Sequence, residues 1–227
     1  MRPLLRALST VLIAAGVLLL VDAGLTLTWQ EPVSALYARL TQDALGGDLE
    51  KLEDAGPTPL EQRVLRSLPD QRRRLAFLGR SLKQRLDGGE AAGRLRIPSI
   101  DLDFVVLDGT SAAHLRKGPG FFPETPFPGS GGTTAIAGHR TTYGAPFRSI
   151  DDLDRGDAIV VEMPYARFEY RVERTRIVDP DAFWVTQRVG YERLVLSACH
   201  PLYSAAQRIV VFARQVRVEP RGRALDT

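Results

Sequence analysis

Residues that bind metals or form cross-links are scarce in this sequence. It has one cysteine, Cys199, and three histidines, so no internal disulfide can form. These four residues show no close ligand spacing, which argues against a zinc site. The acidic residues between positions 151 and 157 lack the spacing of a calcium-binding loop and are more typical of a turn. We therefore predict neither a metal ion nor a cofactor.

A large excess of charge of one sign is also missing. The formal net charge is only +3 at pH 7, and the basic residues are dispersed along the chain, which argues against a nucleic-acid partner. The sequence is 44% hydrophobic and 25% charged, the composition of an ordinary globular protein with an additional apolar segment at its start.

Long amphipathic stretches are missing from the second half of the chain. Between residues 94 and 220 the apolar residues come in short, partly alternating runs, separated by loops rich in glycine and proline. These runs include RLRIPSIDLDFVVLDG, TAIAG, DAIVVEMP and ARFEYRVERTRIV, followed by two β-branched runs. A βαβ fold needs helical crossovers, which are not evident here. We predict an all-β domain over residues 94–220, preferably a closed barrel, and a C-terminal tail over 221–227.

One apolar segment, residues 7–29, is long enough to cross a bilayer as a helix. Two arginines precede it and none follows directly, so the positive-inside rule places residues 1–6 in the cytoplasm and the remaining chain outside. Trp29 would then lie in the outer interface. A cleaved secretory signal ending near Val21-Asp22-Ala23 is the alternative. Because the apolar run continues past that point, we predict an uncleaved single-pass anchor in the cell membrane.

Residues 30–93 differ in composition from both neighbouring segments. Leucines recur at three- and four-residue spacing, as in amphipathic helices, and Gly46-Gly47 and Gly56-Pro57 interrupt the pattern. Basic residues at 72–85 predict a solvated helix face, with contact to anionic lipid or wall polymer as the alternative. Residues 88–93 are glycine-rich, as in a hinge. We predict a helical stalk or spacer rather than part of a folded catalytic unit.

Three residues suggest covalent chemistry. Cys199 ends the β-branched run at 194–196, and Arg208 precedes the run at 209–211, so pairing of the two runs would set the arginine beside the thiol. His139 follows another strand-like run. A thiol attacks as its thiolate, and a nearby imidazole stabilises that charge and shuttles the proton. The arginine offers donors for a developing oxyanion. A lone cysteine is by default a small buried hydrophobe, which is the alternative.

The other two histidines are weaker candidates. His200 directly follows the cysteine, and adjacent side chains of a strand point to opposite faces, so it is a poor partner for the thiol. His114 lies in a turn-like AAHLR segment and is expected to be an ordinary polar residue. No aspartate or glutamate is placed by the sequence as a third catalytic group.

These residues lie in segments that resemble the sortases, membrane-anchored cysteine transpeptidases of Gram-positive bacteria. The segments CHPLYSAAQRIVVFA, AIAGHRTTYGAPF, RKGPGFFP and RIPSIDL resemble in particular the class E sortases of actinobacteria, over about residues 94–218. The resemblance implies the eight-stranded sortase β-barrel with short helices. It also implies that Cys199 is the nucleophile, His139 the proton carrier and Arg208 the oxyanion-stabilising residue.

The resemblance further implies a reaction and its partners. The enzyme would cleave a C-terminal LAXTG- or LPXTG-type motif of a secreted protein between Thr and Gly. It would then transfer the protein to an amine of a peptidoglycan precursor similar to lipid II. Tyr143 is a candidate substrate-binding residue of the groove. Ala198 is a second one, and it departs from the family, which usually has a hydroxyl just before the cysteine.

Two other classes of protein are weighed against this interpretation. The L,D-transpeptidases are also extracytoplasmic β-proteins with a cysteine and a histidine, but their arginine stands two residues after the cysteine. Pro201 occupies that position here, and Arg208 comes much later. A membrane-tethered binding domain with a structural cysteine is the non-enzymatic alternative, and it predicts that Cys199 is inert to thiol reagents.

Overall fold

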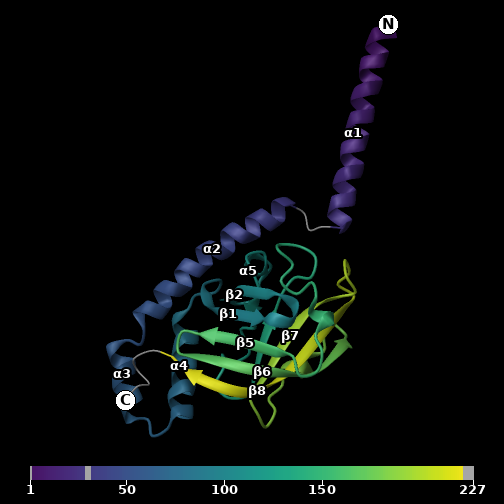
Figure 1. Cartoon of the computed structure of the whole chain (residues 1–227). Coiled ribbons are helices and arrows are strands. Elements are labelled where there is room, and N and C mark those ends of the chain that lie inside the picture. Colours follow the sequence, from purple (N-terminus) through teal and green to yellow (C-terminus); the bar gives the residue numbers. More distant parts are fainter. Residues whose placement is uncertain (1, 29–31, 222–227) are drawn as a thin grey trace.

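The computed structural model describes residues 2–28 and 32–221, and it shows a β-barrel accompanied by helices (Figure 1). Its elements, in chain order, are α1 (Arg2–Thr28), α2 (Pro32–Ala55), α3 (Pro59–Ser67), α4 (Gln71–Arg85), β1 (Ala91–Ile97), η1 (Pro98–Ile100), β2 (Leu102–Asp108), α5 (Ala112–Leu115), β3 (Gly120–Phe121), β4 (Thr133–Ala137), η2 (Ile150–Asp152), β5 (Ala158–Met163), β6 (Ala166–Val178), η3 (Phe183–Thr186), β7 (Arg193–His200) and β8 (Gln207–Pro220).

The strands close into a barrel in the order β1-β2-β3-β4-β7-β8-β6-β5, and the pairing of β1 with β5 completes the ring. Two neighbouring pairs, β2 with β3 and β4 with β7, are parallel, and the other pairs are antiparallel. The predicted all-β class and the eight-stranded closed barrel are thus confirmed within the described chain. Closure removes the free edges that an open sheet would expose.

Alternation along the strands divides the apolar residues between two sides of the barrel wall. On β7, Leu194, Leu196 and Ala198 belong to the main core inside the barrel. Val195, between them, packs outside. It belongs to a second group that we call the outer-face cluster, formed by Ala135, Val195, Val210 and Phe212 and covered by Phe122, Val178 and Val185. The wall formed by β4, β7 and β8 is therefore apolar on both faces.

The helices before the barrel are part of the folded domain, which corrects the prediction of a stalk over residues 30–93. Leu75, Leu78 and Leu82 of α4 belong to the main core, and α2 packs Leu45 and Leu49 against strands β1 and β2. Figure 1 shows α2 running along the side of the barrel. The leucine spacing correctly indicated helices, but spacing alone does not show what surface the apolar face covers.

Of the glycines predicted to interrupt this region, Gly56 follows the end of a helix as expected, whereas the others do not act as breaks. Gly46 and Gly47 lie inside α2, whereas Gly56 follows its end with a positive φ of 58°. The expected hinge at 88–93 is wrong, because strand β1 begins at Ala91. Gly93 lies within that strand, where a Cβ atom would come within 2.6 Å of the Glu162 carbonyl oxygen. Close approach of two strands, rather than flexibility, therefore requires the glycine.

Polar side chains cap helices α3 and α4 and hold them against each other. Thr58 caps α3 in a capping box with Glu61, and Asp70 caps α4. Glu61 is buried and accepts hydrogen bonds from the Ser81 hydroxyl at 2.5 Å and the Thr58 amide at 2.7 Å. Burial by itself raises the pKa of Glu61, but these hydrogen bonds outweigh it and lower the pKa overall. The carboxylate therefore stays ionised as a bridge between α3 and α4.

The basic face predicted on α4 is only partly solvated. Lys83 is partly buried, donates to the carbonyls of Phe122 and Thr125, and lies 4.9 Å from the Phe127 ring centroid. Burial lowers the pKa of Lys83. This lysine ties α4 to the loop that follows β3, so it is not available for binding lipid or wall polymer.

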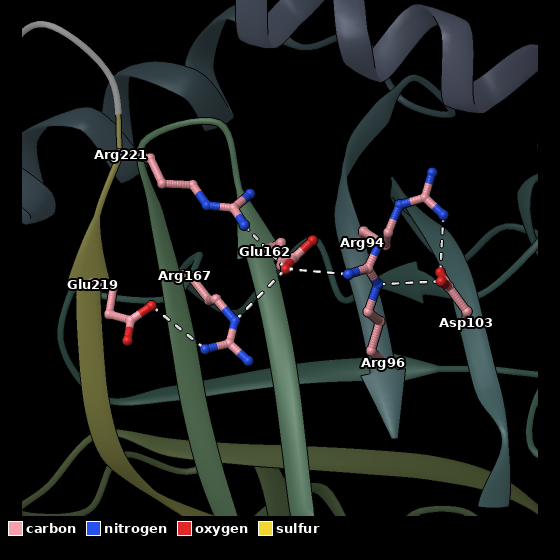
Figure 2. Close-up of polar contacts among 7 residues, drawn as sticks. All are labelled: Arg94, Arg96, Asp103, Glu162, Arg167, Glu219 and Arg221. Carbon is pink, nitrogen blue, oxygen red and sulfur yellow. Dashed lines mark hydrogen bonds and ion pairs between the residues drawn. The ribbon is translucent and has the colours of Figure 1, made fainter. Parts of the chain in front are cut away.

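Charged side chains link five neighbouring strands on the outside of the barrel, as Figure 2 shows. Glu162 of β5 pairs with Arg96, Arg167 and Arg221 at 3.6, 3.6 and 3.0 Å. Asp103 of β2 and Glu219 of β8 extend this network to both sides. Because its carboxylates are shared among several guanidinium groups, the network stabilises strand registration more than isolated surface pairs would.

Helix α1 extends away from the barrel in Figure 1. The large apolar side chains that the structure describes on it are exposed: Leu5, Leu8, Val11, Leu12, Ile13, Val17, Leu18, Leu19, Leu20 and Val21. Within the described residues, no helix meets the combined requirements of length and apolarity for crossing a membrane. The anchor over 7–29 stays a prediction. Trp29, the start of the stalk at residue 30 and nearly all of the predicted tail over 221–227 lie outside the described residues.

Candidate active site

Pairing of β7 with β8 places Cys199 directly opposite Arg208. The two residues stand at the ends of their strands, next to the loop over 201–206 that connects them. By alternation, Cys199 shares its side of the wall with Val195, and Arg208 shares it with Val210, so both point to the face of the outer-face cluster. The arginine predicted to lie beside the thiol therefore does so by strand register.

The parallel pairing of β4 with β7 brings His139 to the same end of the barrel. Ala137 pairs with Ser197, and the Gly138 amide donates to the Ser197 carbonyl at 3.1 Å, so His139 comes level with Cys199. The His139 carbonyl accepts from the Phe147 amide at 2.9 Å. A Cβ atom on residue 138 would lie 2.7 Å from the Phe147 ring, so only glycine lets this buried ring approach. Register and packing together fix the histidine backbone.

Ala198 does not lie with the other predicted site residues. It is 3% exposed and belongs to the main core, on the face of β7 opposite to Cys199. Alternation along the strand explains this placement, which corrects the prediction that Ala198 binds substrate. A hydroxyl at this position would face the barrel interior.

The Cys199 thiol and the Arg208 guanidinium have different surroundings. Cys199 is a free cysteine of intermediate exposure. Arg208 donates from Nη1 to the carbonyls of Ala205 and Gln207, at 2.9 Å each. In the part of the chain that the structure describes, its Nε and Nη2 atoms make no hydrogen bond. The guanidinium is thus oriented by its own loop while donors remain for a ligand.

An aromatic ring and a cation adjoin the His139 imidazole. The Tyr143 ring lies 5.3 Å from the imidazole, centroid to centroid, at an interplanar angle of 46°. The Arg116 guanidinium carbon lies 5.9 Å from the centroid of that tyrosine ring. Burial, and then the positive charge of Arg116, lower the pKa of His139, so the imidazole is predominantly neutral at neutral pH. A neutral imidazole is able to accept the thiol proton.

Replacing Arg116 with glutamine is expected to raise the pKa of His139, because it removes a charge that disfavours the imidazolium. If neutral His139 is the active form, the acidic limb of the activity profile moves to higher pH. An NMR titration of the histidine ring protons measures the shift, with His139→Gln identifying the signal. Lys117→Gln removes a like charge from the next position as a control, and an equal shift there would contradict the assignment to Arg116.

Arg140, which follows His139 directly, has no role predicted from the sequence but has many contacts in the structure. Its side chain is 2% exposed and donates to Asp151 at 2.5 Å, to the Arg148 carbonyl at 3.2 Å and to His200 Nδ1 at 3.3 Å. His200 therefore contacts this arginine. His114 lies apart from this group, close to Gly88, Gly89 and Gly109. A buried charge leaves no periodic signal in a sequence, so the burial and contacts of Arg140 cannot be predicted from the sequence pattern.

No group of three or more potential metal ligands occurs among the residues that the structure describes. The side chains gathered at this end of the barrel wall offer a thiol, an imidazole and a guanidinium.

Comparison with known proteins shows the family to which this fold belongs. Residues 95–216 match the family model described as the sortase domain. The chain belongs to the sortase family. Sortase D of Bacillus subtilis is 32% identical over 132 residues, covering 56% of this chain and 65% of that protein. Sortase SrtE1 of Streptomyces coelicolor is 28% identical over 155 residues, covering 60% of this chain and 43% of that protein.

Solved sortases share the barrel. The structure of sortase E from Streptomyces avermitilis, at 29% identity, covers 62% of this chain and 99% of that one with a TM-score of 0.55. Sortase E1 of Streptomyces coelicolor, solved with a tripeptide in its active site, covers 60% of this chain and 97% of that one at 27% identity and a TM-score of 0.54. This sortase chain matches less than two thirds of the length of the curated relatives named above, 65% and 43%.

Proposed function

We propose that this sortase is a cysteine transpeptidase that anchors secreted proteins to the cell wall. The observation that carries the proposal is the register of three neighbouring strands, which sets Arg208 opposite Cys199 and brings His139 level with both. A nucleophile, a proton carrier and an oxyanion donor on one face are the groups that acyl transfer requires.

In the first step, neutral His139 accepts the proton of Cys199, and the thiolate sulfur attacks the carbonyl carbon of the substrate threonine. The free donors of Arg208 stabilise the negative charge on the former carbonyl oxygen. As the intermediate collapses, the Thr–Gly bond breaks and the His139 imidazolium gives its proton to the leaving glycine amine. A thioester between substrate and Cys199 remains.

In the second step, an acceptor amine attacks the thioester carbon. His139 takes a proton from that amine, an amide bond forms, and the Cys199 sulfur leaves as the thiolate. The His139 imidazolium then returns this proton to the sulfur, which restores the thiol and the neutral imidazole. We propose that the acceptor belongs to a peptidoglycan precursor similar to lipid II. The sorting motif is proposed to be of the LAXTG or LPXTG type, as the resemblance to the sortases implies.

Tyr143 is proposed to border the peptide groove, because its partly exposed ring lies beside His139 at a tilted angle. The Phe122 side chain, which packs on the outer-face cluster, places the loop after β3 on the same face as Cys199. The exposed apolar helix α1 is proposed to anchor the chain in the cell membrane, with the N-terminus in the cytoplasm and the barrel outside.

Mass spectrometry of reaction products tests the proposal. The full chain, in detergent micelles, is incubated with LAXTG and LPXTG peptides, with and without a glycine-bearing amine. We expect cleavage between Thr and Gly, and transfer to the amine when it is present. Prior treatment with iodoacetamide should abolish both products.

Two results would change the proposed function. Hydrolysis without transfer would keep the thioester mechanism and reject the acceptor. No reaction with either peptide, together with a thiol that resists iodoacetamide, would favour a binding domain with a structural cysteine.

A further inference from the structure

The first observation concerns two residues that each follow a member of the catalytic pair. Arg140 follows His139, and His200 follows Cys199, and their side chains contact each other at 3.3 Å between Nη1 and Nδ1. A guanidinium has donors only, so His200 is the acceptor and carries its proton on Nε2. One direct bond therefore connects the segment of the proton carrier to the strand of the nucleophile.

The same guanidinium has two further partners on other segments. Nη2 donates to Asp151 Oδ1 of η2 at 2.5 Å and to the Arg148 carbonyl at 3.2 Å. We call Arg140, Asp151, His200 and the Arg148 carbonyl the Arg140 clamp. Within the described chain, the Arg140 Nε atom is buried without a partner. All hydrogen bonds of this guanidinium are thus directed to holding chain segments together.

Because the Arg140 side chain is buried, its charge depends on the partners that surround it. Its side chain is only 2% exposed, whereas that of Asp151 is 47% exposed. Arginine keeps its charge in proteins, and a buried charge is stable only with its partners in place. Movement of η2 or of the β7 end would separate the charge from an acceptor. The geometry therefore opposes relative motion of the His139 and Cys199 segments.

A second contact joins the same two loops. Arg148 donates from Nη2 to the Tyr203 hydroxyl at 3.3 Å, and its guanidinium lies over the Tyr203 ring at 5.8 Å. This contact is exposed to solvent, so it is weaker than the clamp. It shows that the loop after His139 and the loop after Cys199 are held together at two points.

We propose that Arg140 is a positioning residue, whose clamp holds His139 at working distance from Cys199. The proposal rests on the proposed function, which makes these two residues the catalytic pair. Misplacement of catalytic groups by about 1 Å costs on the order of 10²-fold in rate. Arg140→Gln is therefore expected to lower kcat by about 100-fold while KM changes by less than about 3-fold. Arg140→Lys keeps the charge but cannot reach all acceptors, and should lower kcat by about 10-fold.

Arg193 provides a matched control. It is a buried arginine at the opposite end of β7, and it donates to the carbonyls of Val185 and Gln187. Arg193→Gln should lower stability but leave kcat within about 3-fold, since it touches neither catalytic segment. An equal loss of kcat in Arg193→Gln would overturn a specific positioning role for Arg140. So would an Arg140→Gln variant with wild-type kcat.

A reaction that needs no sorting peptide separates this proposal from the proposed function. The rate at which iodoacetamide alkylates Cys199 is measured for the full chain and for the variants His139→Gln, Arg140→Gln and the double variant. If Arg140 acts through His139, both single variants slow alkylation and the double variant is no slower than His139→Gln. Additive losses, or no effect of Arg140→Gln, would overturn the proposal even if no peptide is ever cleaved.

A loss of activity could also come from a variant that does not fold, so the folding of each variant is checked. If circular dichroism shows that Arg140→Gln is unfolded, Arg140→Lys and Asp151→Asn replace it in both assays. Asp151→Asn keeps an oxygen acceptor at a half-exposed position. It should lower kcat by about 10-fold, with KM within about 3-fold, and slow alkylation. Wild-type values for both variants would overturn the proposal.

Discussion

Replacing Cys199 with alanine is expected to lower the rate of peptide transfer by at least about 10⁴-fold, which is below detection in most assays. The reason is chemical. Without the thiolate no thioester forms, and neither His139 nor Arg208 is a nucleophile able to replace it. Stability should change little, because Cys199 is only partly buried and forms no disulfide. Peptide cleavage followed by mass spectrometry measures the effect.

Ser197→Ala is the matched control for this variant. Ser197 lies two residues before Cys199 on the same strand, and by alternation on the same face. Removal of its hydroxyl should leave the transfer rate within about 3-fold, because no step of the mechanism uses this group. Residual transfer by Cys199→Ala at more than about one hundredth of the wild-type rate would contradict the thioester mechanism.

Replacing Leu82 with alanine is expected to lower the free energy of unfolding by about 2–5 kcal/mol. Leu82 lies on α4, is 2% exposed and belongs to the main core of the barrel. Truncation would remove buried apolar surface and leave a cavity at the contact between α4 and the strands. Urea unfolding of the full chain, followed by fluorescence, measures the change.

Leu60→Ala tests whether this cost comes from packing on the barrel. Leu60 lies on the neighbouring helix α3 but is 70% exposed, so its removal should change stability by no more than about 0.5 kcal/mol. If both leucine variants behave alike, α4 would be a loosely attached spacer. The expected difference would show instead that the stable domain begins before β1, so that fragments starting near residue 93 lack part of their core.

The positive charge near His139 affects the protonation of its imidazole near neutral pH. The pKa of His139 is lowered by burial and by Arg116, so the resting imidazole is neutral and ready to take the thiol proton. In the proposed mechanism, protonation of the leaving amine then depends on the proton taken from Cys199 in the same cycle. Arg116 and Arg140 therefore affect the same histidine in different ways, one through its charge and one through its position.

The candidate chemistry of this protein can be predicted from its sequence. A single cysteine at a strand end, an arginine at the start of the next strand and an upstream histidine predict Cys199, Arg208 and His139 as the reacting groups. Alternating apolar runs identified the β-class, because side chains of a strand alternate between its faces. Each of these signals comes from residues that are close in the sequence or from the order of neighbouring strands. It can therefore be recognised in one sequence.

Which surfaces meet cannot be predicted from the sequence and is seen only in the folded chain. The leucines of α4 have the spacing of any amphipathic helix, and the spacing does not say whether they face the barrel core or a solvent-exposed partner. The same limit applies to Ala198, whose side is set by the register of β7 with β8. It applies most to Arg140, whose acceptors lie 8, 11 and 60 residues further along the chain. Burial and long-range contacts depend on packing, and no local pattern of residues records them.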